Sequence, residues 1–185
     1  MNPSAPPARP LLLVIDLQPA LLNALADGAR VLRRCVFAVE AARGLGLPIL
    51  FTEQVPAKLG PTAPELLAQV EQPAVFAKDE FSALANDAVR TAVRASGATH
   101  LLLAGIETPV CVFQTARDAL AAGLPATLLT DCVGGRRSED AAAAQRHLAR
   151  LGAELLPAET VFYALLQSAR HPFFRAYTQL VKKYA

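Results

Sequence analysis

Residues 101–112 read LLLAGIETPVCV, a strand-like run joined to the start of a helix. The first four residues are uninterrupted apolar ones, as is typical of a strand that is buried on both faces of a parallel sheet. Residues 112–120 have helical spacing, so a short turn with one glycine, one proline and Cys111 connects the two elements. A cysteine at the first turn of a helix lies where backbone N–H groups converge, and that position lowers the pKa of a thiol. The stretch therefore predicts a strand–turn–helix unit that carries a reactive thiol.

The same alternation of strand and helix extends along the whole chain. We expect strands at 10–16, 47–52, 74–77, 99–104, 124–130 and 153–156. We expect helices at 29–45, 65–70, 85–96, 112–122, 138–151, 159–166 and 173–183, with Ser138 as an N-cap and a long loop at 53–64. Strands that alternate with helices indicate right-handed βαβ units. The predicted fold class is α/β: a six-stranded parallel sheet in a three-layer α/β/α sandwich, Rossmann-like in plan.

Length and composition narrow the class of protein. The 185 residues suit one domain, at 10–185, after a flexible lead-in at 1–9 that is rich in proline and alanine. No apolar run reaches the roughly 18 residues of a membrane span, and the first residues lack the pattern of a signal peptide. The net charge is +2, with lysine and arginine spread along the chain, which is no footprint for nucleic acid. We therefore expect a cytoplasmic protein that binds neither membrane nor nucleic acid.

The chain has three cysteines and no CxxC motif. This count argues against a disulfide framework and against a thiolate zinc site. Cys35 lies in the apolar stripe of a helix and is expected in the core. Cys132 follows a strand near the expected cleft, where packing is favoured over contact with substrate.

Three residues with useful chemistry follow three different strands. Asp16, Lys78 and Cys111 each stand at the carboxyl end of an expected strand, and these ends meet at one edge of a parallel sheet. A thiolate can attack a carbonyl carbon, a carboxylate can take and return the proton, and an ammonium favours both ionised forms. Backbone N–H groups of the turn before Cys111 would form the oxyanion hole. Taken singly, the aspartate fits a helix cap equally well, a lone lysine is more often a solvated surface residue, and a lone cysteine is more often buried packing.

Together, several short motifs resemble those of the isochorismatase-like cysteine hydrolases, most closely the isochorismatase-domain-containing group. The motifs are Asp16-Leu17-Gln18, Thr52-Glu53-Gln54, Lys78 with Phe81-Ser82, residues 105–112, Thr115-Ala116, Asp118-Ala119, and Asp131 before Arg136-Arg137-Ser138. The likeness covers residues 11–182. It implies the strand order 3-2-1-4-5-6, a triad of Asp16, Lys78 and Cys111, and a cis peptide bond at Ile106–Glu107. It also implies a homo-oligomer, a dimer or a tetramer.

This sequence differs from two members of the family, the isochorismatases and the nicotinamidases, and both differences restrict the expected activity. Isochorismatases cleave a vinyl ether without a nucleophilic cysteine, so the presence of Cys111 favours hydrolysis of a small amide, imide or related C–N bond. Nicotinamidases of this fold add a metal site, typically an Asp-x-His pair in the second-strand loop. That loop here reads TEQVP at 52–56, and the three histidines, His100, His147 and His171, lie elsewhere. We therefore expect a metal-independent cysteine hydrolase that uses no cofactor and acts on a small-molecule substrate.

Five further residues are candidates for binding the substrate or its oxyanion: Gln18, Phe81, Ile106, Glu107 and Phe113. Structural alternatives stay open for most of them. Glu107 could instead hold the loop in place, Gln18 could form a hydrogen bond across the turn, and the aromatic residues could pack in the core. Arg136-Arg137-Ser138 fits an anion site, a plain helix cap or a subunit contact.

An apolar C-terminal stripe fits internal packing or an oligomer surface; its members are Tyr163, Phe173, Phe174 and Tyr177. Two rival functions stay open: vinyl-ether hydrolysis that rests on Asp16 alone, and a non-catalytic binding or interaction protein on the same fold.

Overall fold

The computed structural model of the protein describes residues 9–184. Residues 1–8 of the expected lead-in lie outside the described residues, and Arg9 is already tied to the domain, because its N–H donates to Thr99 Oγ1 at 2.9 Å. The strands are β1 (Pro10–Ile15), β2 (Ile49–Gln54), β3 (Ala74–Lys78), β4 (His100–Ile106), β5 (Ala126–Gly134) and β6 (Glu154–Leu156). The helices are α1 (Pro19–Leu22), α2 (Gly28–Gly44), α3 (Pro56–Leu59), α4 (Pro64–Leu67), η1 (Ala83–Ala85), α5 (Asp87–Ala95), η2 (Thr108–Val112), α6 (Phe113–Ala121), α7 (Ser138–Arg150), α8 (Ala158–Leu166) and α9 (Phe174–Tyr184).

The sheet has six parallel strands in the order β3-β2-β1-β4-β5-β6, as the family resemblance implies. β1 lies inside the sheet, and all its residues are buried. Because side chains alternate along a strand, Leu12 and Val14 enter one apolar cluster while Leu11, Leu13 and Ile15 enter the other. This explains why the strand is apolar at every position instead of at every second one.

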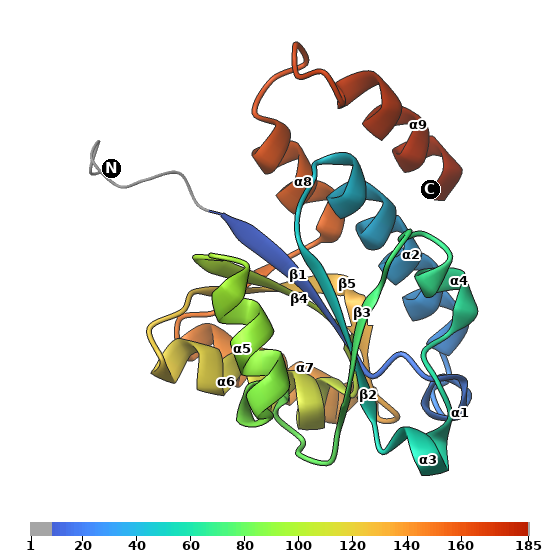
Figure 1. The fold of residues 1–185 in the computed structure, drawn as a ribbon, viewed down its shortest axis with the longest axis vertical. Coiled ribbons are helices and arrows are strands. Elements are labelled where there is room, and N and C mark those ends of the chain that lie inside the picture. The colour runs from blue at the N-terminus through green and yellow to red at the C-terminus, as the bar shows by residue number, and fades with distance from the viewer. Residues whose placement is uncertain (1–8, 185) are drawn as a thin grey trace.

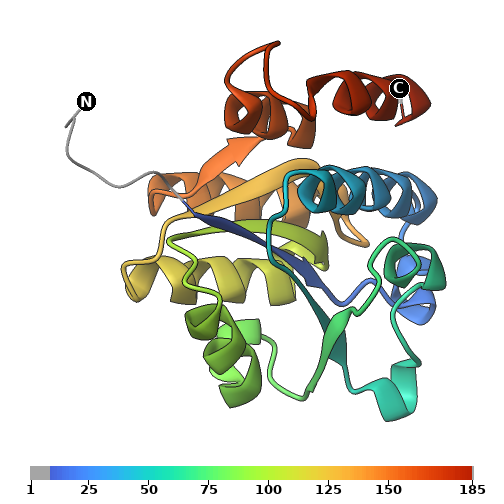
Figure 2. The same cartoon turned by 45° about the horizontal axis from the view of Figure 1, so that its top comes forward.

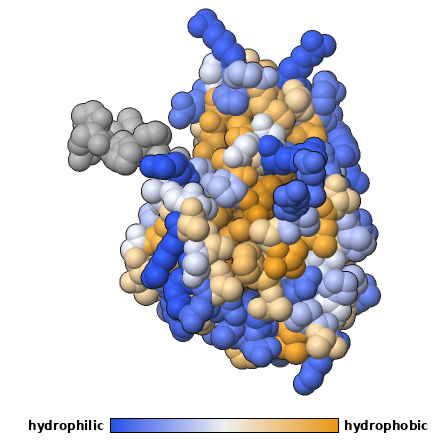
Figure 3. Space-filling model, in the orientation of Figure 1, coloured by the Kyte–Doolittle hydropathy of each residue, from blue (hydrophilic) through white to orange (hydrophobic). Residues whose placement is uncertain are grey.

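Helices cover both faces of the sheet and complete the predicted three-layer sandwich. α2, α8 and α9 lie on one face, and α5, α6 and α7 on the other (Figures 1 and 2). Figure 3 shows the first view as a surface, with apolar residues gathered in its middle and charged ones around them. Within residues 9–184, no helix is both long and apolar enough to cross a membrane. Oligomeric state and cellular location stay predictions.

Several boundaries differ from expectation, and three of the differences have a visible cause or consequence. β5 continues past residue 130 to Gly134, because a register shift between Leu103 and Gly105 of β4 lets the two strands pair again, Gly105 with Val133. β2 reaches Gln54, and the following loop contains the short helix α3. The N-cap of α7 is Arg137, so the cap expected at Ser138 is wrong by one residue.

Cys35 of α2 and Cys132 of β5 lie in the contact between that helix and that strand. Both are fully buried, and their thiols donate to the carbonyls of Cys132 (3.1 Å) and Arg34 (3.3 Å) respectively. Beside them Asp131 accepts the N–H of Ala158, the first residue of α8, at 2.7 Å. The core position expected for Cys35 is thus confirmed, and Cys132 lies on the α2 face of the sheet with a packing role.

The C-terminal aromatic residues pack inward around Tyr177, which is fully buried. Its ring lies 5.9 Å from that of Phe37 on α2 and 4.9 Å from that of Tyr163 on α8. The packing alternative for this stripe is therefore present, while Tyr163 itself stays partly exposed.

Candidate active site

Asp16 is the first residue after β1, in the middle of the sheet. Its backbone has φ 54°, in the left-handed region that non-glycine residues seldom adopt but that aspartate tolerates better than most. The carboxylate is fully buried; its Oδ1 accepts from Thr52 Oγ1 and its Oδ2 from Lys78 Nζ, both at 2.7 Å. Uncommon backbone conformations of this kind are concentrated at functional sites.

Lys78 ends β3, at the edge of the sheet, yet its side chain is fully buried. The ammonium donates to Asp16 Oδ2, to Gln54 Oε1 at 2.5 Å and to the carbonyl oxygen of Glu80 at 3.2 Å. A lysine has three N–H donors, so all of them are used. The alternative of a solvated surface lysine is excluded.

Cys111 lies in η2, a π-helical turn just before α6, and only 6% of it is exposed. Its Sγ is 3.8 Å from Gln54 Oε1. Burial first, and then the negative charge of Asp16, raise the pKa of this thiol to about 12, although the ammonium of Lys78 acts in the opposite direction. The lowered pKa expected from a helix start is therefore wrong, because burial and the carboxylate of Asp16 outweigh the ammonium of Lys78.

The turn that carries Cys111 is fixed by a close approach of β4 to β1. A Cβ on Gly105, where φ is +123°, would lie 2.0 Å from the carbonyl oxygen of Ile15. The following Ile106–Glu107 bond is cis, as the family resemblance implies. Ile106 is the last residue of β4 and is fully buried. Only glycine lets the two strands come this close just before the site.

Gln18 joins two loops. Its Oε1 accepts from the backbone N–H of Gln54 at 2.8 Å, and its Nε2 donates to the carbonyls of Gln54 at 3.1 Å and Gly60 at 2.6 Å. Backbone groups thus occupy both ends of the amide. The alternative of a link across the turn is therefore present in the structure, while the substrate-binding role of Gln18 stays a prediction.

Glu107 pairs with Arg136 on the loop between β5 and α7. Arg136 Nε lies 2.9 Å from Glu107 Oε1, and the Arg136 backbone N–H donates to Oε2 at 3.2 Å. Arg137 pairs with Asp140 at 2.6 Å. These residues line a depression of about 480 Å³ together with Pro109 and Val110. Glu107 therefore braces the turn, and both arginines, for which an anion site was one of three alternatives, are paired with carboxylates.

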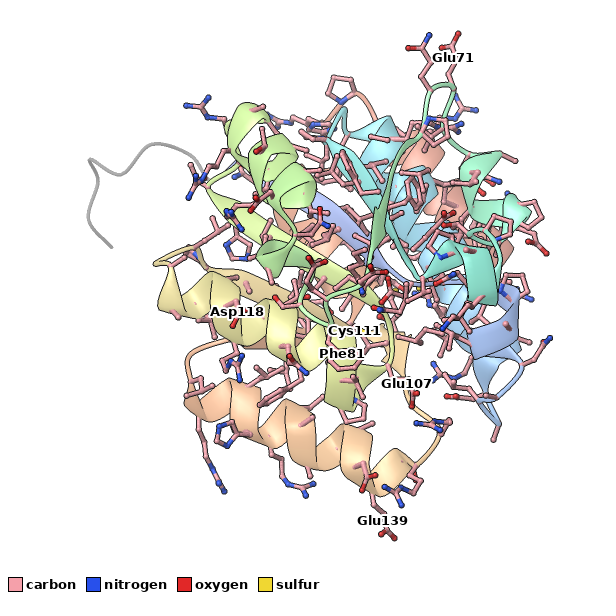
Figure 4. All side chains as sticks on the ribbon, turned by 60° about the horizontal axis from the view of Figure 1, so that its bottom comes forward. Glu71, Phe81, Glu107, Cys111, Asp118 and Glu139 are labelled. Atoms are coloured by element: carbon pink, nitrogen blue, oxygen red, sulfur yellow. The ribbon has the colours of Figure 1, made fainter. Side chains whose placement is uncertain are left out.

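The two aromatic candidates have different surroundings. Phe81, three residues after Lys78, is 54% exposed, and Figure 4 labels it together with Cys111, the two projecting onto the same part of the view. The ring of Phe113 packs against His147 of α7, with the ring centres 5.8 Å apart. Phe81 thus keeps a surface that a ligand can reach, while Phe113 belongs to the packing between α6 and α7.

Two polar residues of this site, Thr52 and Gln54, were not among the expected site residues. They alternate at the end of β2, so their side chains leave the strand on the same side, toward Asp16 and Lys78. Glu53, between them, turns away and accepts from Thr62 N at 2.7 Å. Two polar residues at positions i and i+2 of an otherwise apolar strand end were the available signal.

No cluster of three or more His, Cys, Asp or Glu side chains within residues 9–184 is arranged to hold a metal ion. The charged groups that face Cys111 are Asp16 and Lys78. The arrangement thus offers a thiol, a base and a fixed positive charge.

The protein is thus an α/β protein with a buried Cys, Asp and Lys at the carboxyl edge of a parallel sheet, and comparison with known proteins identifies its family. The isochorismatase domain matches residues 10–160, so the chain belongs to the isochorismatase family. Isochorismatase domain-containing protein 2A of Mus musculus is 33% identical over 96% of this chain and 84% of its own length.

Two solved structures are similar throughout. A structure described as MAR1 ribonuclease from Caenorhabditis elegans has a TM-score of 0.90 and 29% identity, over 96% of this chain and 92% of that one. YcaC from Pseudomonas aeruginosa, described with hexane-2,5-diol and covalent acrylamide, has a TM-score of 0.84 and 26% identity, over 95% and 94%.

Proposed function

We propose that the protein is a metal-independent cysteine hydrolase that acts on a small amide, imide or related C–N bond. One observation carries the proposal: a thiol, a carboxylate and an ammonium from three different strand ends meet in a buried cluster. The cost of burying an ion pair is considerable. A fold that needed only packing would fill this position better with apolar side chains.

The mechanism follows from the protonation state of the site. The resting Cys111 is a neutral thiol at physiological pH, since its pKa is raised to about 12. As sulfur attacks the carbonyl carbon, its proton passes to Asp16, so that no free thiolate has to accumulate. Asp16 then gives this proton to the leaving nitrogen, and the C–N bond breaks to leave a thioester. Water attacks the thioester with Asp16 again as the base, which releases the acid and restores the thiol.

Lys78 acts on these reaction steps through its charge. Its three N–H donors are engaged with Asp16, Gln54 and Glu80, so it holds the carboxylate in place without touching the substrate. Backbone N–H groups between Ile106 and Cys111 bind the oxyanion of the tetrahedral intermediate. In a preorganised site each such donor stabilises the transition state by about 3–4 kcal/mol. Phe81 offers an exposed ring to the substrate's apolar part.

The name of the YcaC structure, with its covalent acrylamide, supports a nucleophile in this fold. Vinyl-ether hydrolysis by Asp16 is the runner-up, and a non-catalytic binding protein is the third reading. The C. elegans neighbour is described as a ribonuclease, and RNA therefore belongs in the substrate panel. Arg136 and Arg137, which line the depression that Glu107 also lines, are paired with Glu107 and Asp140, which does not favour binding of a polyanion.

Intact-mass spectrometry with a library of small amides tests the proposal. A substrate should leave an acyl adduct on the protein that is lost in Cys111→Ala. The matched control is Cys132→Ala, which removes a thiol on the other face of the sheet and should keep the adduct. Full turnover by Cys111→Ala would overturn the cysteine mechanism; isochorismate cleavage by that variant would establish the vinyl-ether alternative.

A further inference from the structure

Gln54 is the residue through which the thiol and the ammonium meet. It ends β2 with 9% of its surface exposed. Its Oε1 accepts from Lys78 Nζ at 2.5 Å and faces Cys111 Sγ at 3.8 Å. The mechanism above assigns it no chemical step, yet it contacts two members of the triad.

The side-chain amide of Gln54 cannot rotate by 180° without losing hydrogen bonds. Its Nε2 donates to the carbonyl of Asp79 at 2.9 Å, which fixes the oxygen toward Lys78 and Cys111. Its backbone N–H and carbonyl are held by the side chain of Gln18, which also reaches Gly60. The oxygen is therefore held where it is by groups from three other segments.

A neutral amide oxygen in this place distinguishes between a thiol and a thiolate. It can accept a hydrogen bond from S–H, but it presents lone pairs to a thiolate and offers no donor. It also engages an N–H of Lys78 that would otherwise be free to approach the sulfur, since the other two go to Asp16 and Glu80. Both effects favour the protonated sulfur.

We propose that Gln54 is a positioning residue that keeps Cys111 as a thiol in the resting enzyme, by accepting its S–H and by holding the Lys78 ammonium away from it. The inference rests on the proposed function, because in that mechanism the thiol loses its proton only when the sulfur attacks a substrate. A buried thiol kept protonated is also protected from solvent electrophiles. Asp16 and Lys78, the charged groups that face the sulfur, are not substituted in any variant below.

The test is the pH dependence of Cys111 alkylation by iodoacetamide, located by peptide mass spectrometry, which needs no substrate. Gln54→Met has a similar length and no oxygen acceptor, so Lys78 becomes free to approach the sulfur. We expect alkylation at neutral pH to become several-fold faster. Gln54→Glu is nearly isosteric and can still pair with Lys78, but it places a second carboxylate beside the sulfur. We expect alkylation to become several-fold slower and its pH profile to move to higher pH.

Opposite shifts from two substitutions at one position are not expected of a merely structural residue. Glu53→Gln, one residue earlier and directed at Thr62, is the control and should alkylate at the wild-type rate. Wild-type rates in both Gln54 variants, or shifts in the same direction, would overturn the proposal. If Gln54→Met does not fold, the near-isosteric Gln54→Glu decides alone: an unchanged or faster rate overturns the proposal. Turnover of small amides is measured separately, so failure of the hydrolase proposal remains distinguishable.

Discussion

The ammonium of Lys78 lies 2.7 Å from the carboxylate of Asp16, and neither side chain is exposed to solvent. The pair joins β3, at the edge of the sheet, to β1 at its centre, across the end of β2. Thr52 completes it from β2 by donating to the other carboxylate oxygen. The proposed catalysis and the stability of the fold therefore depend on the same contact.

Loss of Lys78 alone should be more harmful than loss of both charges. Lys78→Met leaves the Asp16 carboxylate buried without its ammonium, which should lower the free energy of unfolding by about 3–5 kcal/mol. Adding Asp16→Asn removes the stranded charge, so the double variant should lose less than the sum of the two single losses. Urea unfolding at neutral pH measures all three variants. Additive losses would show that the two groups do not interact as a pair.

Cys111 should alkylate slowly at neutral pH. Because burial and the charge of Asp16 raise its pKa to about 12, the reactive thiolate is scarce, and the iodoacetamide rate should increase about tenfold per pH unit between about pH 7 and pH 10. In the urea-unfolded chain the rate should level off near the ordinary cysteine pKa of about 8.5. A plateau in the folded protein at or below that pH would show that the thiol is activated at rest.

The same shift has a consequence for stability in alkali. Between the ordinary pKa of the unfolded chain and the raised pKa of the folded one, the folded state holds a proton that the unfolded state has lost. The contribution of Cys111 is then fully present below about pH 8.5 and is lost as pH rises toward 12. Cys111→Ala should flatten the fall of the unfolding free energy over this range, measured by urea titrations at several pH values. An equal slope in the variant would contradict the raised pKa.

The parts of the structure that follow from short-range patterns could be predicted. Apolar runs such as 101–104 define the strands, and glycines and prolines mark their ends. Asp16, Lys78 and Cys111 could be placed together because the carboxyl ends of parallel strands share an edge. The strand order came from the family resemblance, since alternation of strands and helices is compatible with several orders.

The unpredicted parts depend on contacts between segments far apart in the chain. Gln18 binds Gln54 across 36 positions, and nothing local indicates that its amide braces a loop. The extension of β5 depends on a register shift in its neighbour. The sequence predicts a lowered thiol pKa because a helix start is visible in the sequence, whereas the burial and the nearby Asp16 that raise the pKa are not.

Gly105 should tolerate no side chain, unlike Gly46 at the end of α2. Both have positive φ, at +123° and +68°, so alanine should strain each backbone, at a cost of about 1–2 kcal/mol in the left-handed region. At Gly46 nothing lies within 4 Å of the added Cβ, and that strain should be the whole effect. At Gly105 the Cβ would lie 2.0 Å from the carbonyl oxygen of Ile15, so β1 and β4 must separate just before Asp16. We expect Gly105→Ala to lose well over 2 kcal/mol of unfolding free energy and most Cys111 adduct formation, while Gly46→Ala keeps the adduct. Thermal and urea unfolding measure the stability of both variants. If Gly105→Ala and Gly46→Ala lost the same unfolding free energy, this would contradict the close approach of the two strands.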